Sequence, residues 1–333
     1  MAPKFSGSII FQTVECFRHS EIAEFSNSKH NDKEITRQEL KSEGKSATWA
    51  NLADNMGIYS SKTYENYLKI SVEFGRFCAS KDGFNLKHIE NAKSKHVEAF
   101  INHKLEQGIS RNYFKQICAA IGKLETILNM TAEKFGTGKQ YHWDAALNKV
   151  REAAYASFGE KENYNRAYAN PQAVLENLSG KYQTAAEIQF YGLARISEST
   201  NIKIDQFKRI EIHPVLGEVG TIDIIGKGGK HNIIYIPIST YEKALEMAKE
   251  HGSFYVNKDT YRDKVNAAAN AAGEVKTNVS LATHSIRWSG ASTRFGTYIK
   301  AGMTYEQSLS ACAKSLTHER LEVSRLYLQG GRK

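Results

Sequence analysis

The sequence predicts a mainly α-helical protein of two domains that also contains a small β-hairpin or sheet. The chain has 333 residues, which corresponds to two domains of ~100–200 residues each. It contains only four prolines, so long helices can run without interruption. Two isoleucine-rich segments, 221–225 and 232–238, flank the glycine-rich sequence GKGGK, as expected for two strands and their turn.

The composition excludes several classes of protein. Hydrophobic residues make up 41% of the chain and charged residues 24%, which is usual for a globular protein and excludes a disordered or fibrous one. No stretch reaches the ~18–20 apolar residues of a membrane span, and the N-terminus lacks the apolar core of a signal peptide. The four cysteines are scattered without a CxxC pair, so we expect no zinc site, no disulfide and a reducing, cytoplasmic location.

The chain is basic along its whole length. Its net charge is +9, with +3 over residues 1–160 and +6 over the remainder. Such a balance favours a polyanionic partner such as nucleic acid, although charge alone does not identify one.

The first predicted domain is helical. Residues 1–58 are polar and poorly periodic, apart from a short helix near 48–56, and are predicted to be an N-terminal extension of unknown role. Apolar residues then recur at helical spacing from position 61, from position 97 and, after a suitable capping residue at Ser110, from position 114. We therefore predict a compact helical domain over residues 59–157.

A second domain follows a polar linker. Residues 158–170 lack periodicity and form the predicted linker, and Asn170 with Pro171 suits the cap and first turn of a new helix. The second domain is predicted over residues 171–333. Besides the hairpin, its expected helices run to about Gly192 and then over 240–250, 260–272, 284–296, 303–314 and 320–328.

Five separated segments of the chain contain cationic or polar residues at informative places. They are GLARISE (192–198), IIGKGGKHN (224–232), THSIRWSGAS (283–292), LTH (316–318) and RLYL (325–328). Each segment alone also has a structural explanation. For example, Arg195 and Glu198 have the spacing of a helical ion pair, and lysines are common in hairpin turns because turns are solvated.

Taken together, the five segments resemble the tyrosine recombinase, or phage integrase, family over residues 60–333. That family carries an arginine in a GLRISE-like segment, a lysine in a hairpin turn, an HxxR helix, a later histidine and a C-terminal tyrosine nucleophile. The matching residues are Arg195, Lys227, His284, Arg287, His318 and Tyr327. The block beginning KTYENYLKISVEFGRF resembles the core-site DNA-binding domain of the family. The resemblance thus implies a helical core-binding domain followed by a mixed α/β catalytic domain.

The chain departs from the family pattern at three positions. Thr317 stands where glycine usually precedes the second histidine, and Trp288 stands where histidine frequently follows the arginine. Asn232 stands where the hairpin often has arginine. None of these departures removes a member of the set, so the resemblance implies a divergent branch of the family.

The resemblance implies a reaction at a DNA phosphodiester, and the residue types suit that chemistry. The planar guanidinium groups of Arg195 and Arg287 could hold the nonbridging oxygens without a metal or other cofactor. Tyr327 would attack phosphorus to form a 3′-phosphotyrosyl link and a free 5′-hydroxyl. Because a free phenol has a pKa of ~10, the cations and a histidine must help it to ionise.

The resemblance implies supporting roles for the other members of the set. Lys227 is the expected general acid for the departing 5′ oxygen, and Lys230 is the less favoured substitute. His284 and His318 would donate hydrogen bonds to the phosphate or shuttle protons, and Glu198 would support Arg195 or His284. Predicted DNA contacts are Lys115, Lys123, Lys230, Arg262 and Lys264.

The sequence leaves open how His318 and Tyr327 could reach the same phosphate. In a straight helix, nine steps of ~100° place His318 and Tyr327 on opposite faces. They can meet at one phosphate only if His318 precedes the helix or the helix breaks between them. Alternatively, Tyr327 acts in the site of another subunit.

Three functions fit these observations. The leading one is a site-specific recombinase that integrates or excises a mobile element, acting as a homo-tetramer on two DNA duplexes with an inverted-repeat core site. It would be nucleoid-associated when bound to DNA and could use accessory or directionality proteins. The alternatives are a type IB topoisomerase, which uses the same nucleophile as a monomer, and a catalytically silent DNA-binding accessory protein of the same fold.

Overall fold

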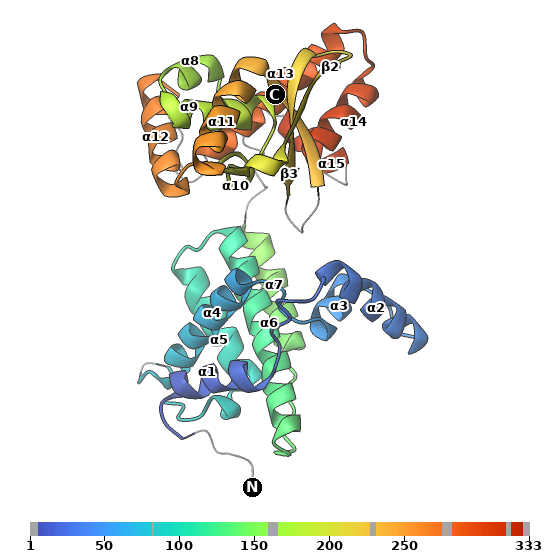
Figure 1. Cartoon of the computed structure of the whole chain (residues 1–333). Helices are drawn as coiled ribbons and strands as arrows, with labels where there is room; N and C mark the ends of the chain where they lie inside the picture. Colours follow the sequence, from blue (N-terminus) through green and yellow to red (C-terminus); the bar gives the residue numbers. More distant parts are fainter. Residues whose placement is uncertain are drawn as a thin grey trace. The chain divides into compact units, whose positions relative to one another are not determined.

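The chain folds into two compact units, residues 1–160 and 161–333 (Figure 1). The computed structural model describes residues 6–81, 83–158, 166–226, 231–274, 282–317 and 321–328. Among these, no helix is both long enough and apolar enough to cross a membrane. The prediction of a mainly helical, two-domain chain with a small antiparallel sheet is confirmed.

In the part that the structure describes, the regular elements of the first unit are helices, apart from one isolated β-bridge between Ala23 and Ile58. Its elements are α1 (Ile9–His19), α2 (Lys29–Ser42), α3 (Trp49–Asn55), α4 (Ser61–Ala79), the short 3₁₀ helix η1 (Ile89–Asn91), α5 (Ser94–Glu106), α6 (Arg111–Lys134) and α7 (Asp144–Ser157). The Ser110 hydroxyl accepts a hydrogen bond from the Tyr113 backbone N–H at 3.2 Å, so the predicted cap of α6 is confirmed.

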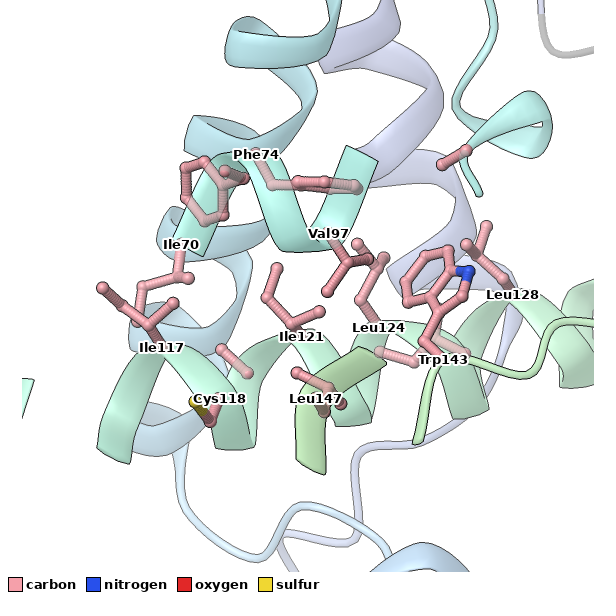
Figure 2. Packing of buried hydrophobic residues seen from close by; sticks show 14 of the residues in the cluster. Ile70, Phe74, Val97, Ile117, Cys118, Ile121, Leu124, Leu128, Trp143 and Leu147 are labelled. Atoms are coloured by element: carbon pink, nitrogen blue, oxygen red, sulfur yellow. The ribbon is translucent and has the colours of Figure 1, made fainter. Parts of the chain in front are cut away.

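The core of this unit lies between α4, α5, α6 and α7. Figure 2 shows apolar side chains from these four helices meeting there. Phe74 of α4, Val97 of α5 and Ile121 of α6 are fully buried, and Trp143 at the start of α7 packs edge-on against Phe74. The periodic apolar faces predicted from the sequence therefore form one continuous core.

Helix α1 also belongs to this core, which corrects the prediction of a polar N-terminal extension over residues 1–58. Its Cys16 and Phe17 are buried among α4 and α6 residues. The sequence pattern misses α1 because its buried face also carries polar groups. Gln12 donates to the carbonyl of Lys87 at 3.1 Å and accepts from the N–H of Ile89 at 3.0 Å, so burial leaves it hydrogen-bonded. Helices α2 and α3 form a small separate cluster from Leu40, Leu52 and Met56.

The second unit combines helices with two small antiparallel sheets. Its helices are α8 (Pro171–Glu176), α9 (Gly180–Tyr191), α10 (Ile196–Ser199), the 3₁₀ helix η2 (Ile204–Gln206), α11 (Ile238–His251), α12 (Lys258–Ala271), α13 (Ala282–Lys300), α14 (Tyr305–Ser315) and α15 (Leu321–Leu328). Strands β2 (Phe207–His213), β3 (Gly217–Ile225) and β4 (His231–Pro237) form one sheet in the order β2-β3-β4. Strands β1 (Asn201–Lys203) and β5 (Ser253–Tyr255) form the other.

The predicted hairpin is the β3–β4 pair. Ile222 pairs with Ile234, and both side chains are buried in the core of the second unit. Strand β2 and the β1–β5 pair were not predicted from the sequence. Strand β2 lies at the edge of its sheet, and its Ile210 and Ile212 are exposed, so it lacks the alternation of a half-buried strand.

Helix α13 lies against α9, α12, α14 and α15, and its middle is largely buried. It approaches α9 closely at Gly290, where a Cβ atom would lie 2.0 Å from the Phe190 carbonyl oxygen. This contact sets the position of the helix that carries the HSIRW segment.

Candidate active site

Arg195 lies at the start of α10, where Glu198 fixes it through two contacts. The Glu198 carboxylate accepts from the Arg195 backbone N–H at 2.6 Å and from its Nη1 at 2.8 Å. Glu198 is buried, whereas the Arg195 side chain is 29% exposed. The expected support of Arg195 by Glu198 therefore takes the form of a partly buried charge pair that also caps the helix.

Thr317 provides a second partner for Arg195. Arg195 Nη1 donates to the Thr317 hydroxyl at 2.9 Å, and that hydroxyl donates to the Leu316 carbonyl at 2.6 Å. The Thr317 backbone has φ +55°, in the left-handed region that glycine adopts without strain. This conformation gives a physical reason for a glycine at this position, and the threonine here adds a hydroxyl contact to Arg195.

Arg287 is almost completely buried, and two of its donor nitrogens have no partner among the described residues. Its side chain is 1% exposed, and Nη2 donates to the Leu316 carbonyl at 2.7 Å. Its Nε and Nη1 have no hydrogen-bond partner among the described residues. Burial lowers the pKa of Arg287 to about 10, and the group stays protonated at neutral pH. A buried cation with two unsatisfied donor nitrogens is suited to bind an anion.

His284 lies one helical turn before Arg287 on α13 and faces Tyr327. The Tyr327 hydroxyl and His284 Nε2 are 3.3 Å apart, with donor and acceptor set by the histidine tautomer. Burial, and then the charges of Arg287, Arg166 and Arg195, lower the pKa of His284 to about 4. The imidazole is therefore neutral at neutral pH, and its Nε2 can accept the phenol proton.

The Tyr327 ring is held between other aromatic and cationic groups. It stacks on Trp288 with ring centroids 4.5 Å apart and an interplanar angle of 21°. The Arg287 guanidinium carbon lies 5.8 Å from the Tyr327 ring centroid. Only 7% of Tyr327 is exposed, and it forms a small buried cluster with Leu193, Trp288 and Leu316.

The structure brings Arg195, Glu198, His284, Arg287 and Tyr327 together, although they come from three separated helices, α10 with its N-cap, α13 and α15. Lys227, Lys230 and His318 lie outside the described residues. The Tyr327 hydroxyl contacts His284 of its own chain. The combination of a neutral base, a phenol and two arginines can bind a phosphate group and activate an oxygen nucleophile beside it.

Three contributors to this site were not predicted from the sequence. Thr317 and Trp288 were noted only as departures from a pattern, and Arg166 was not singled out. The Arg166 guanidinium lies 5.6 Å from the Trp288 ring centroid. No sequence signal identifies such a contact, because it depends on how residues 166–170 return to α13.

One predicted DNA contact is wrong on structural grounds. Lys123 is 8% exposed, and its Nζ donates to the carbonyls of Ala53 at 2.7 Å and Met56 at 2.8 Å. It therefore satisfies the C-terminal carbonyls of α3 and holds that helix to α6, rather than facing solvent.

The remaining predicted DNA contacts are at the surface. Lys115 and Lys264 are exposed. Arg262 is partly exposed and forms an ion pair with Asp259 at 2.8 Å. These three residues stay predictions. Among the described residues no group of three or more His, Cys, Asp or Glu side chains could hold a metal ion.

Comparisons with known proteins agree with this architecture. Residues 45–134 match the family model of the phage integrase N-terminal domain. No curated protein matches the chain in sequence. The XerH site-specific recombinase in a pre-cleavage complex with its difH substrate is 16% identical, with 98% of this chain and 95% of that chain covered and a TM-score of 0.59. Its post-cleavage complex with palindromic difH is 17% identical, with 96% and 91% covered and a TM-score of 0.58.

A lambda integrase dimer bound to a COC′ core site is also similar. It is 14% identical, with 92% of this chain and 79% of that chain covered and a TM-score of 0.50. At these identities the similarity establishes the fold. The chain has the two-domain fold of these recombinase and integrase structures, and residues 45–134 match the phage integrase N-terminal model. Both findings agree with the family resemblance described from the sequence.

Proposed function

We propose that the chain is a site-specific DNA recombinase that breaks and rejoins DNA strands through a 3′-phosphotyrosyl intermediate. The observation that carries the proposal is the contact of the Tyr327 hydroxyl with neutral His284, beside the unsatisfied donors of buried Arg287. A purely structural tyrosine would not require two arginines in its surroundings.

In the proposed cleavage step, the Tyr327 oxygen attacks phosphorus while His284 Nε2 takes the phenol proton. The bond from phosphorus to the 5′ oxygen breaks as the new bond from phosphorus to the tyrosine oxygen forms. Arg195 and Arg287 hold the nonbridging oxygens, whose negative charge is greatest in the transition state. The departing 5′ oxygen takes a proton from Lys227, the proposed general acid. Reversal of these steps with another 5′-hydroxyl rejoins a strand, so no external energy source is needed.

The two units would divide the work. Residues 59–157 are proposed to bind the core site, with Lys115 at the DNA, and residues 171–333 to perform catalysis, with Arg262 and Lys264 as further contacts. Lys230 and His318 are proposed to contact DNA and the phosphate, respectively. The structures most similar to this chain include XerH on difH substrates and lambda integrase on a core site, which supports double-stranded DNA as the partner.

The finer parts of the proposal concern assembly and role. We propose that the protein acts as a homo-tetramer on two duplexes with an inverted-repeat site and moves a mobile element. We also propose nucleoid association and the use of accessory proteins. Delivery of Tyr327 within its own subunit is favoured, because the tyrosine contacts His284 of the same chain.

Covalent trapping tests the proposal. The protein is mixed with sheared DNA from its source, quenched with SDS, and the DNA fragments linked to protein are sequenced. Adducts that cluster at a short inverted repeat with wild-type protein, and are absent with Tyr327→Phe, are the expected result. Binding of both proteins to the recovered site should be equal and should weaken as salt is raised, since phosphate contacts release counterions.

Other outcomes identify the alternatives. Adducts scattered without sequence preference, together with relaxation of supercoiled DNA, would indicate a topoisomerase. Salt-sensitive DNA binding without any adduct would indicate an accessory protein of this fold.

A further inference from the structure

We propose that Trp288 and Arg166 are positioning residues that hold the Tyr327 ring against His284. The inference rests on the proposed function, in which Tyr327 is the nucleophile. It assigns a role to two side chains that do not themselves contact the phosphate in the proposed reaction.

Trp288 provides the flat surface on which the Tyr327 ring lies. The two rings are nearly parallel, with an angle of 21° and a centroid separation of 4.5 Å, and both residues are 7% exposed. The indole Nε1 has no hydrogen-bond partner among the described residues. Trp288 is thus held by its ring faces rather than by a polar contact, which is consistent with a role in stacking.

Arg166 lies against the same indole. Its guanidinium carbon is 5.6 Å from the Trp288 ring centroid, within the range of a cation–π interaction. Arg166 therefore contacts the same indole ring on which Tyr327 stacks.

The backbone beside Arg166 is attached to α13 at several points. The Tyr168 N–H donates to the Ser289 hydroxyl at 2.8 Å, and the Tyr168 hydroxyl donates to the Ala282 carbonyl at 2.9 Å. Ala167 packs against the cluster that contains Trp288 and Tyr327. These contacts keep Arg166 close to the indole, although α13 lies more than a hundred residues further along the chain.

Such positioning matters because Tyr327 is carried by a short helix. The described part of α15 has eight residues, and the Ser292 hydroxyl donates to the Tyr327 carbonyl at 3.3 Å. That bond places the backbone but leaves the side-chain torsions free. Stacking on Trp288 restricts the ring, and a displacement of ~1 Å in a reacting group can lower a rate by ~100-fold.

The first test measures whether the two residues hold Tyr327 in the absence of DNA. Tetranitromethane nitrates accessible tyrosines, and trypsin releases Tyr327 in residues 326–332, which contain no other tyrosine. Tyr305, which is 41% exposed, and Tyr261, which is fully buried, are also alone in their tryptic peptides and serve as internal references. Mass spectrometry then gives the nitration rate of each site.

We expect wild-type Tyr327 to be nitrated several-fold more slowly than Tyr305. Trp288→Ala and Arg166→Ala should raise the nitration rate of Tyr327 several-fold without changing that of Tyr261. Trp288→Phe and Arg166→Lys should keep most of the protection. Arg209→Ala removes an arginine whose side chain is 83% exposed in β2, and is the matched control that should change nothing at Tyr327.

Unchanged nitration of Tyr327 in Trp288→Ala and Arg166→Ala would overturn the proposal. If Trp288→Ala unfolds the protein, Tyr261 becomes nitrated as well, and Arg166→Ala decides the matter. On the DNA site recovered by trapping, both alanine variants should form adducts about tenfold more slowly while binding DNA equally, and Trp288→Phe should restore the rate. Wild-type protein that forms no adduct would refute the proposed function, whereas the nitration series tests the positioning separately.

Discussion

His284 is the residue whose surroundings most directly affect the proposed chemistry. Burial and three arginines lower its pKa to about 4, compared with about 6.5 for an unperturbed histidine. His284 is therefore neutral at pH values above its pKa. We expect the rate of adduct formation to show no histidine-dependent decline between about pH 7 and about pH 5. Single-turnover cleavage at a series of pH values measures this. A decline centred near pH 6.5 would contradict the assigned state of His284.

The same lowered pKa predicts how stability depends on pH. Between about pH 6.5 and about pH 4 the unfolded chain binds the extra proton, so the free energy of unfolding falls as pH falls through this window. Burial also lowers the pKa of His96 and His213, which contribute in the same direction. Replacing His284 with Gln should reduce the slope of the free energy of unfolding against pH in this window by up to ~1.4 kcal/mol per pH unit. Urea unfolding at several pH values checks the change.

Thr317 combines an unfavourable backbone conformation with a useful hydroxyl. Thr317→Ala loses the bond to Arg195 and keeps a Cβ atom at φ +55°, so we expect it to lower the free energy of unfolding by about 1 kcal/mol. Thr317→Gly loses the same bond but relieves the backbone, so it should be about 1 kcal/mol more stable than Thr317→Ala. Chemical denaturation of both variants measures the difference. Equal stability would mean that the backbone conformation carries no strain.

At the scale of elements, the position of α13 depends on its contact with α9. Gly290→Ala would put a Cβ atom 2.0 Å from the Phe190 carbonyl oxygen, so the helices must separate, at about 1–3 kcal/mol. Gly296 lies in the same helix, and outside its own helix backbone no heavy atom of the described residues lies within 4 Å of the position that a Cβ atom would take. Gly296→Ala should therefore stabilise the protein by about 0.5–1 kcal/mol. Thermal unfolding of the two variants measures these changes. A Gly290→Ala variant as stable as the wild type would contradict the close packing.

Lys123 gives a corresponding prediction for the first unit. Lys123→Met removes two hydrogen bonds to α3 carbonyls, and we expect the free energy of unfolding to fall by about 2–3 kcal/mol. Lys115→Met, at an exposed position of the same helix, should change it by less than about 0.5 kcal/mol. Denaturation of both variants separates the structural lysine from the surface one. Similar stability of the two variants would contradict the role given to Lys123.

Sequence periodicity predicted the elements that are strongly amphipathic and missed those that are not. The core helices α4 and α6 and the isoleucine-rich β3–β4 pair follow the expected patterns. Helix α1 buries Gln12, Thr13 and Glu15 on its inner face, which hides its apolar period. Strand β2 exposes Ile210 and Ile212 at a sheet edge, and no local pattern distinguishes such a strand from a loop.

At the scale of the whole molecule, the order of motifs predicted which residues meet in the site, but not how they are held. Arg195, His284, Arg287 and Tyr327 could be identified together because their segments resemble the tyrosine recombinase family in order and spacing, and their residue types suit chemistry at a phosphate. The stacking of Tyr327 on Trp288 depends on tertiary packing between segments that are distant in the chain, and the sequence contains no local signal for it. The burial of Lys123 has the same origin, because its partners lie about seventy residues earlier.

The central claim is that Tyr327 is the residue that becomes linked to DNA. The most direct test is mass spectrometry of trapped adducts after digestion with nuclease and trypsin. Residues 326–332 should carry the mass of a nucleotide joined through phosphate, and fragmentation should place it on Tyr327. An adduct-containing sample in which this peptide is unmodified and the nucleotide lies on another residue would contradict the account.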